Sequence, residues 1–245
     1  MNAFPNKFVL ILIALAVCSS CSKPDAKKFF NAGDTKYTSG DYAGAIAEFD
    51  KAIQIDPNYI KAYNNRGMAK DAIKDEAGAI ADYTKAIDLN PQYQFGYYNR
   101  GNTEQNLENY TKAIADYDKA NELNPQDTAV YLNRGNTKYR LNDYTGAIAD
   151  FDKAIELNPQ YAKAYNSRAA AKYHLNDFNG AILDCNKAIE INPQYAEAYN
   201  NRGTAKRGLK NYDDAIADYD KAIEINPQYA KALSNRAEVQ ALKAQ

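Results

Sequence analysis

The chain has 245 residues, of which 45% are hydrophobic and 25% are charged, so its composition is that of an ordinary soluble protein with one or two domains and not that of a disordered chain. Its 30 basic residues are scattered among 31 acidic ones, and the formal net charge is -1. No stripe of positive charge therefore points to a nucleic-acid-binding surface.

The first 20 residues have the layout of a secretory signal peptide. Lys7 precedes an apolar run at residues 8–17, FVLILIALAV, and the small residues Ser19 and Ser20 follow closely. Ten apolar residues are too few to span a bilayer as a helix. The sequence therefore predicts an exported protein.

Cys21 resembles the lipid-modified cysteine of bacterial lipoproteins, because small residues precede it and a short polar stretch, SKPDAKK, follows it. Such a motif usually has Leu or a similar aliphatic residue three positions earlier, where this chain has Cys18. The resemblance implies a protein at the periplasmic face of a bacterial envelope, with a lipid anchor at Cys21 and residues 21–25 as a short tether. The alternative is a soluble exported protein, either periplasmic or secreted. With Cys18 removed and Cys21 acylated, Cys185 has no partner, which excludes a disulfide framework.

An internal repeat follows the tether. Prolines at 57, 91, 125, 159, 193 and 227 are spaced by 34 residues, and four of the six lie in the sequence NPQY. If each proline is placed at repeat position 32, six units result: 26–59, 60–93, 94–127, 128–161, 162–195 and 196–229. Residues 230–245 copy the first half of a unit.

Both halves of each unit have apolar residues at helical spacing, so each unit is predicted to be a helical hairpin. Between the halves of the fourth unit, Asn142 can adopt the left-handed conformation that ends a helix, and Asp143 can cap the next helix. The second helix is expected to stop before the proline, since the residue before Pro is disfavoured in a helix. The Asn-Pro pair is then expected to start the next helix, with Asn as its cap and Pro in its first turn.

The units resemble the tetratricopeptide repeat, a family with an aromatic residue at position 4, a small residue at 8, Ala at 20, an aromatic at 24, Ala at 27 and Pro at 32. Positions 20 and 27 are Ala in all six units, position 4 is Phe or Tyr, and position 24 is aromatic except for Cys185. The resemblance implies an all-α fold, a right-handed α-solenoid of six 34-residue helical hairpins with a C-terminal capping helix at 230–245. The Gly or Ala at position 8 is expected to face Ala at position 20, so that the two helices of a hairpin approach closely.

Arg occupies position 7, where the family usually has an apolar residue, in five units and in the capping segment: Arg66, Arg100, Arg134, Arg168, Arg202 and Arg236. Position 23 is acidic in every unit: Glu48, Asp82, Asp116, Asp150, Asp184 and Asp218. Pairing within a unit leaves Glu48 and Arg236 without partners, whereas pairing each acid with the Arg of the next unit leaves no acid and no Arg unpaired. We therefore predict six ion pairs between neighbouring units, from Glu48–Arg66 to Asp218–Arg236.

Lys occupies position 11 in five units, where the family prefers a large apolar residue: Lys36, Lys70, Lys138, Lys172 and Lys206. Because positions 7 and 11 share a helix face, these lysines either join the same ionic network or extend to water. The sequence leaves both alternatives open.

The family resemblance implies a concave surface on which positions 2, 5, 6, 9, 12 and 13 of the first helices face a bound peptide. Position 6 is here a nearly unbroken row of amides, with Ser167 in the fifth unit: Asn31, Asn65, Asn99, Asn133, Asn201 and Asn235. A side-chain amide both donates and accepts hydrogen bonds, so this row is predicted to bind a peptide backbone. It resembles the asparagine ladder of the glycosyltransferase that modifies Ser and Thr. The alternative is that these amides only cap or solvate the helix surface.

The middle of this surface is predicted to hold the anchors of a bound segment. The facing positions carry aromatic and apolar residues flanked by basic ones: Phe95, Tyr98, Leu132, Tyr139 and Tyr173, with Arg140 and Lys163. No three consecutive units supply the Lys, Asn and Arg set with which chaperone-binding members of the family hold a C-terminal carboxylate. Recognition of an acidic C-terminal tail is therefore not expected.

Catalysis is not expected. His174 is the only histidine, no second His or Cys lies at metal-ligand spacing, and no glycine-rich phosphate-binding loop is present in the sequence. Acidic residues recur every 34 positions, which is typical of architecture and not of a unique active site. His174, at position 13, is expected on the concave surface, and no metal or cofactor is predicted.

These features predict a scaffold or adaptor that binds an extended segment of another envelope protein in its concave groove. The alternative is a structural protein that self-associates through the solenoid edges or through its first unit, where Phe29 and Phe30 are expected to be exposed. The expected partner is a protein or peptide. Membrane contact is expected only through the lipid anchor, and no nucleic-acid partner is expected.

Overall fold

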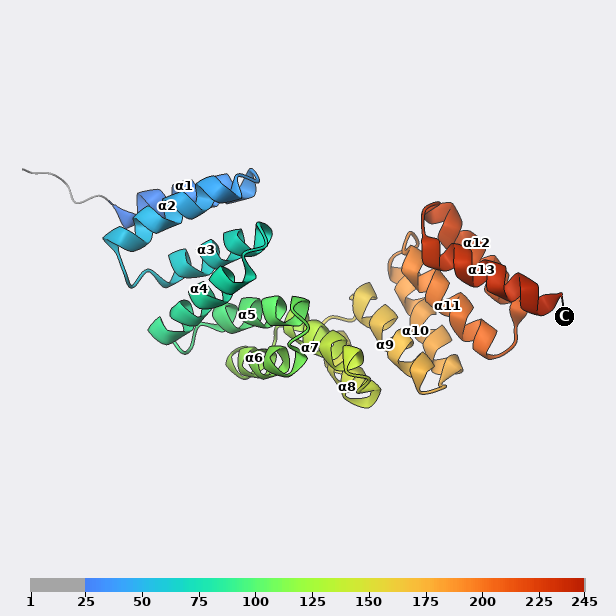
Figure 1. Cartoon of the computed structure of the whole chain (residues 1–245). Helices are drawn as coiled ribbons and strands as arrows, with labels where there is room; N and C mark the ends of the chain where they lie inside the picture. Colours follow the sequence, from blue (N-terminus) through green and yellow to red (C-terminus); the bar gives the residue numbers. More distant parts are fainter. Residues whose placement is uncertain (1–24, 245) are drawn as a thin grey trace, which may run out of the picture.

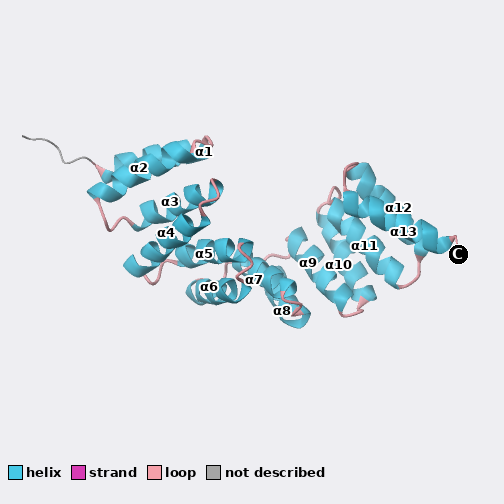
Figure 2. Cartoon of the chain, viewed as in Figure 1, coloured by secondary structure: helices cyan, strands magenta, loops and turns pink. Residues whose placement is uncertain are grey.

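The computed structural model describes residues 25–244, and every regular element in this range is an α-helix (Figure 1, Figure 2). Residues 1–24, which include the predicted signal peptide, Cys21 and most of the predicted tether, lie outside the described residues. Within 25–244, no helix combines the length and the apolar character that crossing a bilayer requires.

Each of the six units contains a first and a second helix, and one further helix follows the sixth unit. The first helices and this last one are α1 (Ala26–Thr38), α3 (Ile60–Ala72), α5 (Gln94–Asn106), α7 (Thr128–Arg140), α9 (Ala162–His174), α11 (Ala196–Gly208) and α13 (Ala230–Lys243). The second helices are α2 (Tyr42–Ile55), α4 (Glu76–Leu89), α6 (Tyr110–Leu123), α8 (Tyr144–Leu157), α10 (Phe178–Ile191) and α12 (Tyr212–Ile225).

The hairpins stack into a curved array (Figure 1). Each helix packs against the next along the chain, and the first helices of neighbouring units also contact one another. The second helices of neighbouring units make no such contact within the described residues, so the first helices lie closer together and line the inner side of the curve. The predicted all-α solenoid is confirmed, with α13 packed against α12 at its end.

The turn within each hairpin contains one residue with a positive φ angle, and in four of the six hairpins an Asp caps the second helix. Asn142 has a φ of 61°, in the left-handed region, and it ends α7 as predicted. The Asp143 carboxylate accepts a hydrogen bond from the Gly146 amide at 2.9 Å, which caps α8. Both predictions for this turn are confirmed.

The connection between units differs from the prediction. Asn158 ends α8 in an extended conformation, and its Oδ1 accepts a hydrogen bond from the Gln160 amide at 3.0 Å. The next helix begins only at Ala162, with Tyr161 at the cap position. The prediction that Asn-Pro starts the next helix is therefore wrong, because the Asn side chain closes a turn around Pro159 instead of capping a helix.

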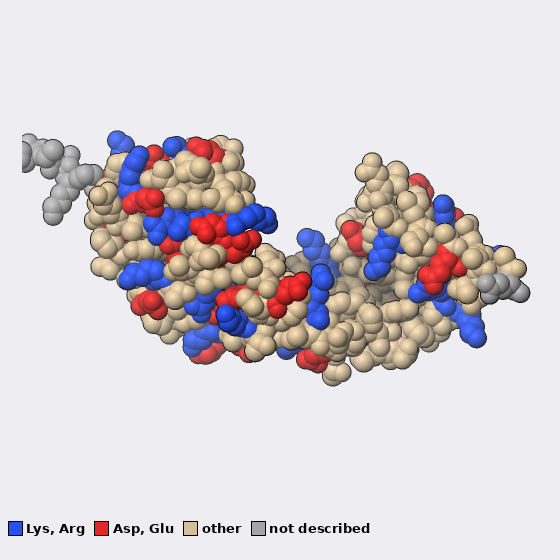
Figure 3. Space-filling view, in the orientation of Figure 1, with Lys and Arg blue, Asp and Glu red and all other residues tan. Residues whose placement is uncertain are grey.

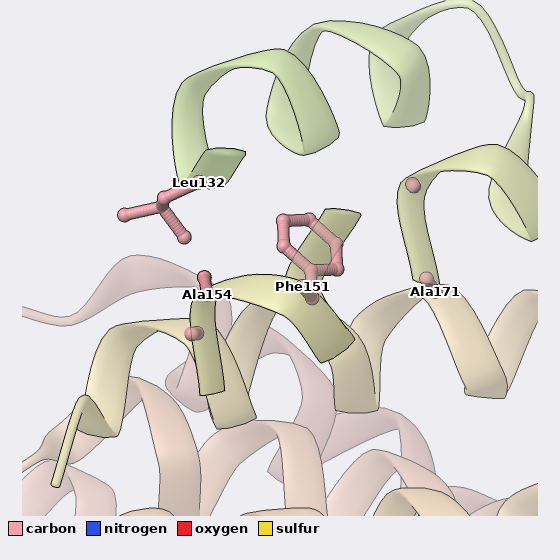
Figure 4. Packing of buried hydrophobic residues seen from close by; sticks show 6 residues of the cluster. Leu132, Phe151, Ala154 and Ala171 are labelled. Atoms are coloured by element: carbon pink, nitrogen blue, oxygen red, sulfur yellow. The ribbon is translucent and has the colours of Figure 1, made fainter. Parts of the chain in front are cut away.

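The small residue at position 8 makes room for the side chain at position 24. A Cβ atom on Gly135 would lie 2.6 Å from Cε1 of Phe151, whose side chain is fully buried. Figure 4 shows this ring projecting from its helix toward the helix that bears Leu132. The closest contact of position 8 is thus with the aromatic ring, which the prediction did not name. The predicted neighbour at position 20 also lies close: a Cβ on Gly203 would lie 3.0 Å from the carbonyl oxygen of Ala215, and Ala169 shares a buried cluster with Ala181.

The fifth unit departs from this pairing at both positions. It has Ala169 at position 8 and Cys185 at position 24, and the two share one buried cluster. Burial raises the pKa of the Cys185 thiol to about 12, so the thiol is protonated at neutral pH and acts as a small apolar residue.

Asn121 interrupts the apolar contacts between the third and fourth units. It stands at position 28, where the other five units have Ile, and is only 7% exposed, yet neither Nδ2 nor Oδ1 has a hydrogen-bond partner among the described residues. We expect Asn121→Leu, which keeps the branching and the number of heavy atoms, to raise the free energy of unfolding by about 1–2 kcal/mol.

Denaturant unfolding measures this gain. The control is Asn179→Leu, the same change at an exposed site of α10, which we expect to alter stability by less than about 0.5 kcal/mol. A loss of stability in Asn121→Leu would mean that the buried amide is hydrated or bonded in solution.

Candidate functional site

In five of the six hairpins, an Arg at position 7 links the two helices. Nε and Nη2 of Arg134 donate hydrogen bonds to Asp150 of the same unit at 3.0 and 2.5 Å, and Nη1 donates to Asp118 of the preceding unit at 2.6 Å. The pairing within a unit recurs as Arg66–Asp82, Arg100–Asp116, Arg168–Asp184 and Arg202–Asp218. Hydrogen bonds with Asp218 raise the pKa of Arg202, so this guanidinium stays charged.

The predicted ion pairs between position 23 and the next Arg are therefore wrong. Positions 7 and 23 lie opposite each other across one hairpin, which places the carboxylate closest to the Arg of its own unit. The two residues that this pairing leaves over have other partners: Glu48 pairs with Lys36 and Lys51, and Arg236 pairs with Asp220. The contact between units runs instead through position 25, the position of Asp118 and Asp220.

The Lys at position 11 joins the same network. Nζ of Lys138 lies 2.8 Å from Asp150, and Lys70, Lys172 and Lys206 contact their own position 23 in the same way at 2.8–2.9 Å. Of the two alternatives that the sequence left open, the structure shows the ionic one. Because both basic residues of a unit share one buried carboxylate, these groups position helices and are not free to bind a ligand.

The asparagine row connects the first helices of neighbouring units. Each Nδ2 donates to a side chain of the preceding unit at 2.7–2.9 Å: Asn65 to Asp34, Asn99 to Asn64, Asn133 to Asn102, Asn201 to Asn166 and Asn235 to Asn200. These amides therefore hold the inner surface together. That the row also binds a peptide backbone stays a prediction.

Two adjoining cavities open on the inner surface toward the C-terminal end of the array. We treat the two as one site and call this site the C-terminal inner cavity. The larger, of about 240 Å³, is lined by Tyr139, Ala169, Ala170, Tyr173, His174, Asn201, Thr204, Arg207, Lys231 and Asn235. The smaller, of about 140 Å³, is lined by Asn136, Tyr139, Asn166, Ser167, Ala170, Asn201 and Lys231. The site thus draws on the four first helices α7, α9, α11 and α13.

An aromatic cluster forms one wall of this site. The His174 ring stacks on Tyr144, with ring centroids 4.6 Å apart and planes within 4°, and its Nε2 lies 2.9 Å from the hydroxyl of Tyr139. Burial raises the pKa of Tyr139, so its hydroxyl stays protonated. His174 is exposed and lines the cavity, as its position predicted. The wall therefore presents flat rings with polar edges.

The inner surface has a different charge at its two ends. Lys231 and Arg207 line the C-terminal inner cavity, and Arg207 also pairs with Glu238 at 2.8 Å. Both blue and red side chains border the hollow of the array in Figure 3. Toward the N-terminal end, a cavity of about 280 Å³ contains Asp71, which accepts hydrogen bonds from Tyr83 at 2.8 Å and Thr103 at 2.6 Å. Burial raises the pKa of Asp71, while these two hydrogen bonds act in the opposite direction.

The predicted anchors do not form one site. Tyr139, Tyr173, Asn201 and Asn235 line the C-terminal inner cavity. Leu132 is 7% exposed and packs in the hydrophobic core with Phe151, so it offers almost no surface to a ligand. Other predicted residues lie elsewhere on the surface. Phe95 is 55% exposed, Tyr98 is half-buried against Tyr117, and Asn99 lines the cavity that contains Asp71. Arg140 and Lys163 are exposed, and neither lines the C-terminal inner cavity.

Sequence reasoning missed several residues of the cavity. Thr204, Arg207 and Lys231 stand at positions 9, 12 and 2, which the family resemblance had already assigned to the concave surface. The prediction concentrated on the aromatic residues of the third to fifth units, and in the sixth unit and the cap it applied only position 6, which gave Asn201 and Asn235. Reading those positions to the end of the chain finds all three residues.

The first unit offers less apolar surface than expected. Phe29 and Phe30 are both partly buried: Nζ of Lys51 lies 5.6 Å from the Phe29 ring centroid, and Phe30 packs against Phe49 and Tyr59. The exposed phenylalanines that motivated the self-association alternative are therefore largely covered.

Family models classify the chain. The tetratricopeptide repeat model matches residues 95–127, 128–161, 162–195 and 196–229, a second model of this repeat matches 60–93, and a TPR repeat model matches 33–70. The chain is a tetratricopeptide repeat protein. Proteins of this family generally act as scaffolds for protein–protein interaction and not as enzymes.

Solved structures share the fold of this tetratricopeptide repeat protein. One from Parabacteroides merdae has a TM-score of 0.76 at 20% identity, over 89% of this chain and 87% of that one. PilF from Pseudomonas aeruginosa has a TM-score of 0.75 at 18% identity, over 87% and 97%. YrrB, described as a TPR protein with an unusual peptide-binding site, has 0.64 at 24% identity, over 77% and 97%. A comparison with curated proteins found no match.

Proposed function

We propose that this tetratricopeptide repeat protein holds an extended segment of another envelope protein against its inner surface, with one side chain of that segment in the C-terminal inner cavity. The supporting observation is that four consecutive first helices bring aromatic, amide and basic side chains to two adjoining cavities. Aromatic residues and Arg are the usual anchors of protein interfaces. The scaffold acts by binding.

The size of the site favours a segment of a longer chain over a small molecule. The larger cavity alone, of about 240 Å³, is smaller than the roughly 300–1,000 Å³ that small-molecule sites usually occupy, and the two adjoining cavities together reach only the low end of that range. Its walls combine the rings of Tyr139 and Tyr173 with the ammonium group of Lys231. An inserted side chain can therefore pack against the rings while the neighbouring backbone carbonyls accept hydrogen bonds from the basic group.

We expect Tyr173→Ala to weaken peptide binding about tenfold or more, because truncation of an aromatic anchor costs at least about 1.4 kcal/mol of binding free energy. Peptides are first selected from a displayed random library for binding to the unaltered protein, and their affinity for each variant is measured by fluorescence anisotropy. Tyr110→Ala is the matched control, since Tyr110 begins α6 and lines neither cavity wall. Circular dichroism verifies that both variants fold.

Equal affinity of the selected peptides for Tyr173→Ala and the unaltered protein would place the binding surface elsewhere. Selection of peptides that lose affinity only in Tyr110→Ala would reject the inner surface as the site.

We also propose that the protein is exported and attached to a membrane by a lipid on Cys21. The support is the sequence pattern around this residue, where an apolar run and small residues precede the cysteine. In a bacterial host, the unaltered chain is expected to incorporate labelled palmitate and to sediment with membranes, whereas Cys21→Ser loses the label and becomes soluble. Sedimentation of unlabelled Cys21→Ser with membranes would contradict the anchor.

A further inference from the structure

We propose a second docking site, on the outer face of α13, for a helix of a partner protein that carries an acidic residue next to a small one. This site is separate from the C-terminal inner cavity, so it does not depend on the function proposed above. It follows from comparing α13 with the six first helices, each of which is covered by the second helix of its own unit. No second helix follows α13 within the described residues.

The guanidinium group of Arg236 on α13 forms only part of the hydrogen bonds that the equivalent Arg residues form. Its Nη1 donates to Asp220 of the preceding unit at 2.7 Å, just as Nη1 of Arg134 donates to Asp118. In the five units with Arg, Nε and Nη2 form a pair of hydrogen bonds with the position 23 carboxylate. In Arg236, Nε is buried and has no partner among the described residues. In the five units with Arg, this edge of the guanidinium meets a carboxylate, which α13 itself does not receive.

The surface around this group carries one large apolar, one small and one polar side chain. Leu233, Ala237 and Gln240 stand at positions 4, 8 and 11, on the face that meets the second helix in a complete unit, and all three are exposed, Leu233 by 38%. Burying this face removes apolar area from water, and the carboxylate of an incoming helix completes the charge pair of Arg236. Apolar contact and charge therefore favour the same occupant.

The residue at position 8 defines which helix fits. Units with Gly at this position accept an aromatic ring at position 24, whereas Ala169 is paired with Cys185. α13 has Ala237 at position 8, so the docked helix must carry a small residue after its acid. The pattern is that of α10, where Ala181, Asp184, Cys185 and Ala188 are all buried in the array. A partner helix of the form Ala-x-x-Asp-small-x-x-Ala meets every requirement.

A second copy of the chain is a poor occupant. In the described residues, each Asp at position 23 already pairs with the Arg of its own unit, and Glu48 pairs with two lysines. A second copy could offer such a helix only by opening one of its own hairpins, which exposes the core residues between the two helices. The occupant that we propose is therefore a helix of a different protein.

The probe that tests this site is a synthetic peptide with the sequence of α10 and Ala in place of Cys185, held helical by a cross-link between two outward-facing positions. Its affinity for the full chain is measured by fluorescence anisotropy. We expect Arg236→Gln to weaken binding at least tenfold, and an Asp184→Asn peptide to bind the unaltered chain as weakly. Combining the two changes is expected to cause little further loss, because both remove the same pair.

Two comparisons decide the specificity and the location. A cross-linked peptide with the sequence of α8, which carries Phe151 after Asp150, is expected to bind the unaltered chain more weakly than the α10 peptide and to gain affinity in Ala237→Gly. Tyr173→Ala is expected to leave both affinities unchanged. Equal binding by Arg236→Gln, or a loss confined to Tyr173→Ala, would overturn the proposal. So would a concentration-dependent dimer of the chain that Arg236→Gln abolishes, since its occupant is then a second copy.

Discussion

Asp150→Ala is expected to lower the free energy of unfolding by about 3–5 kcal/mol, because it leaves buried basic groups without their counter-charge. The Asp150 side chain is 4% exposed and receives Nε and Nη2 of Arg134 as well as Nζ of Lys138. Removing the carboxylate leaves two cations facing each other at the interior edge of one hairpin. Denaturant unfolding of the variant measures the loss.

Asp118→Ala provides a matched control on the same guanidinium. The Asp118 side chain is 57% exposed and bonds only Nη1 of Arg134 at 2.6 Å, so its removal is expected to cost less than about 1 kcal/mol. A double-mutant cycle that combines Arg134→Met with Asp150→Leu is expected to show strong coupling between the two residues. A cycle that combines Arg134→Met with Asp116→Leu is expected to show little coupling. A larger cost for Asp118→Ala than for Asp150→Ala would mean that the pairing across units carries the stability.

The fold could be predicted because its determinants are local and repeat. Proline at position 32 and Ala at positions 20 and 27 fix where helices stop and where they approach, and the turn at Asn142 and Asp143 was predicted at the level of single residues. The Asn-Pro turn was not, because Asn can cap the helix that follows it or close a turn around the next residues. Both conformations use the same side-chain oxygen, and only the structure shows the second.

The direction of the ion pairs could not be predicted by counting acids against arginines. The count omitted two sets of charges: the lysines at position 11, which supply partners for Glu48, and the acids at position 25, which supply one for Arg236. Once these are included, pairing within a unit leaves no buried acid or Arg wholly unpaired, and the numbers no longer favour pairing across units. Distance then decides, and the carboxylate across the hairpin is the closer one.

The candidate site was predicted only in part, for a related reason. Positions on the inner surface follow from the repeat, but whether a side chain there is exposed depends on its neighbours. Leu132 and Tyr139 occupy positions 5 and 12 of the same helix, yet Leu132 is buried in the core cluster and Tyr139 lines the cavity. The amides at position 6 likewise bond to the first helix of the preceding unit, which no single repeat reveals.

The pairing of positions 8 and 24 leads to a prediction in which one substitution has opposite effects in two backgrounds. Gly135→Ala is expected to destabilise the unaltered protein by about 1–2 kcal/mol, because the new Cβ would lie 2.6 Å from the Phe151 ring and overpacking outweighs the gain in helix propensity. Phe151→Cys alone is expected to cost about 3–5 kcal/mol through the cavity that it leaves. In that background Gly135→Ala is expected to stabilise by about 1 kcal/mol, since the methyl group then enters free space and Ala favours the helix.

The fifth unit supplies the reverse experiment, because it already has the small pair Ala169 and Cys185. Cys185→Phe is expected to destabilise the protein, and adding Ala169→Gly is expected to recover part of the loss, although Ala169→Gly alone costs about 1 kcal/mol. Denaturant unfolding of all six variants gives both cycles.

If Gly135→Ala changes stability by the same amount with Phe at position 151 as with Cys at position 151, the two sites do not interact. The glycine is then required by some other contact of the hairpin. A reversal of sign in both units would establish that ring size at position 24 selects the residue at position 8, which is the same rule that selects the helix for α13.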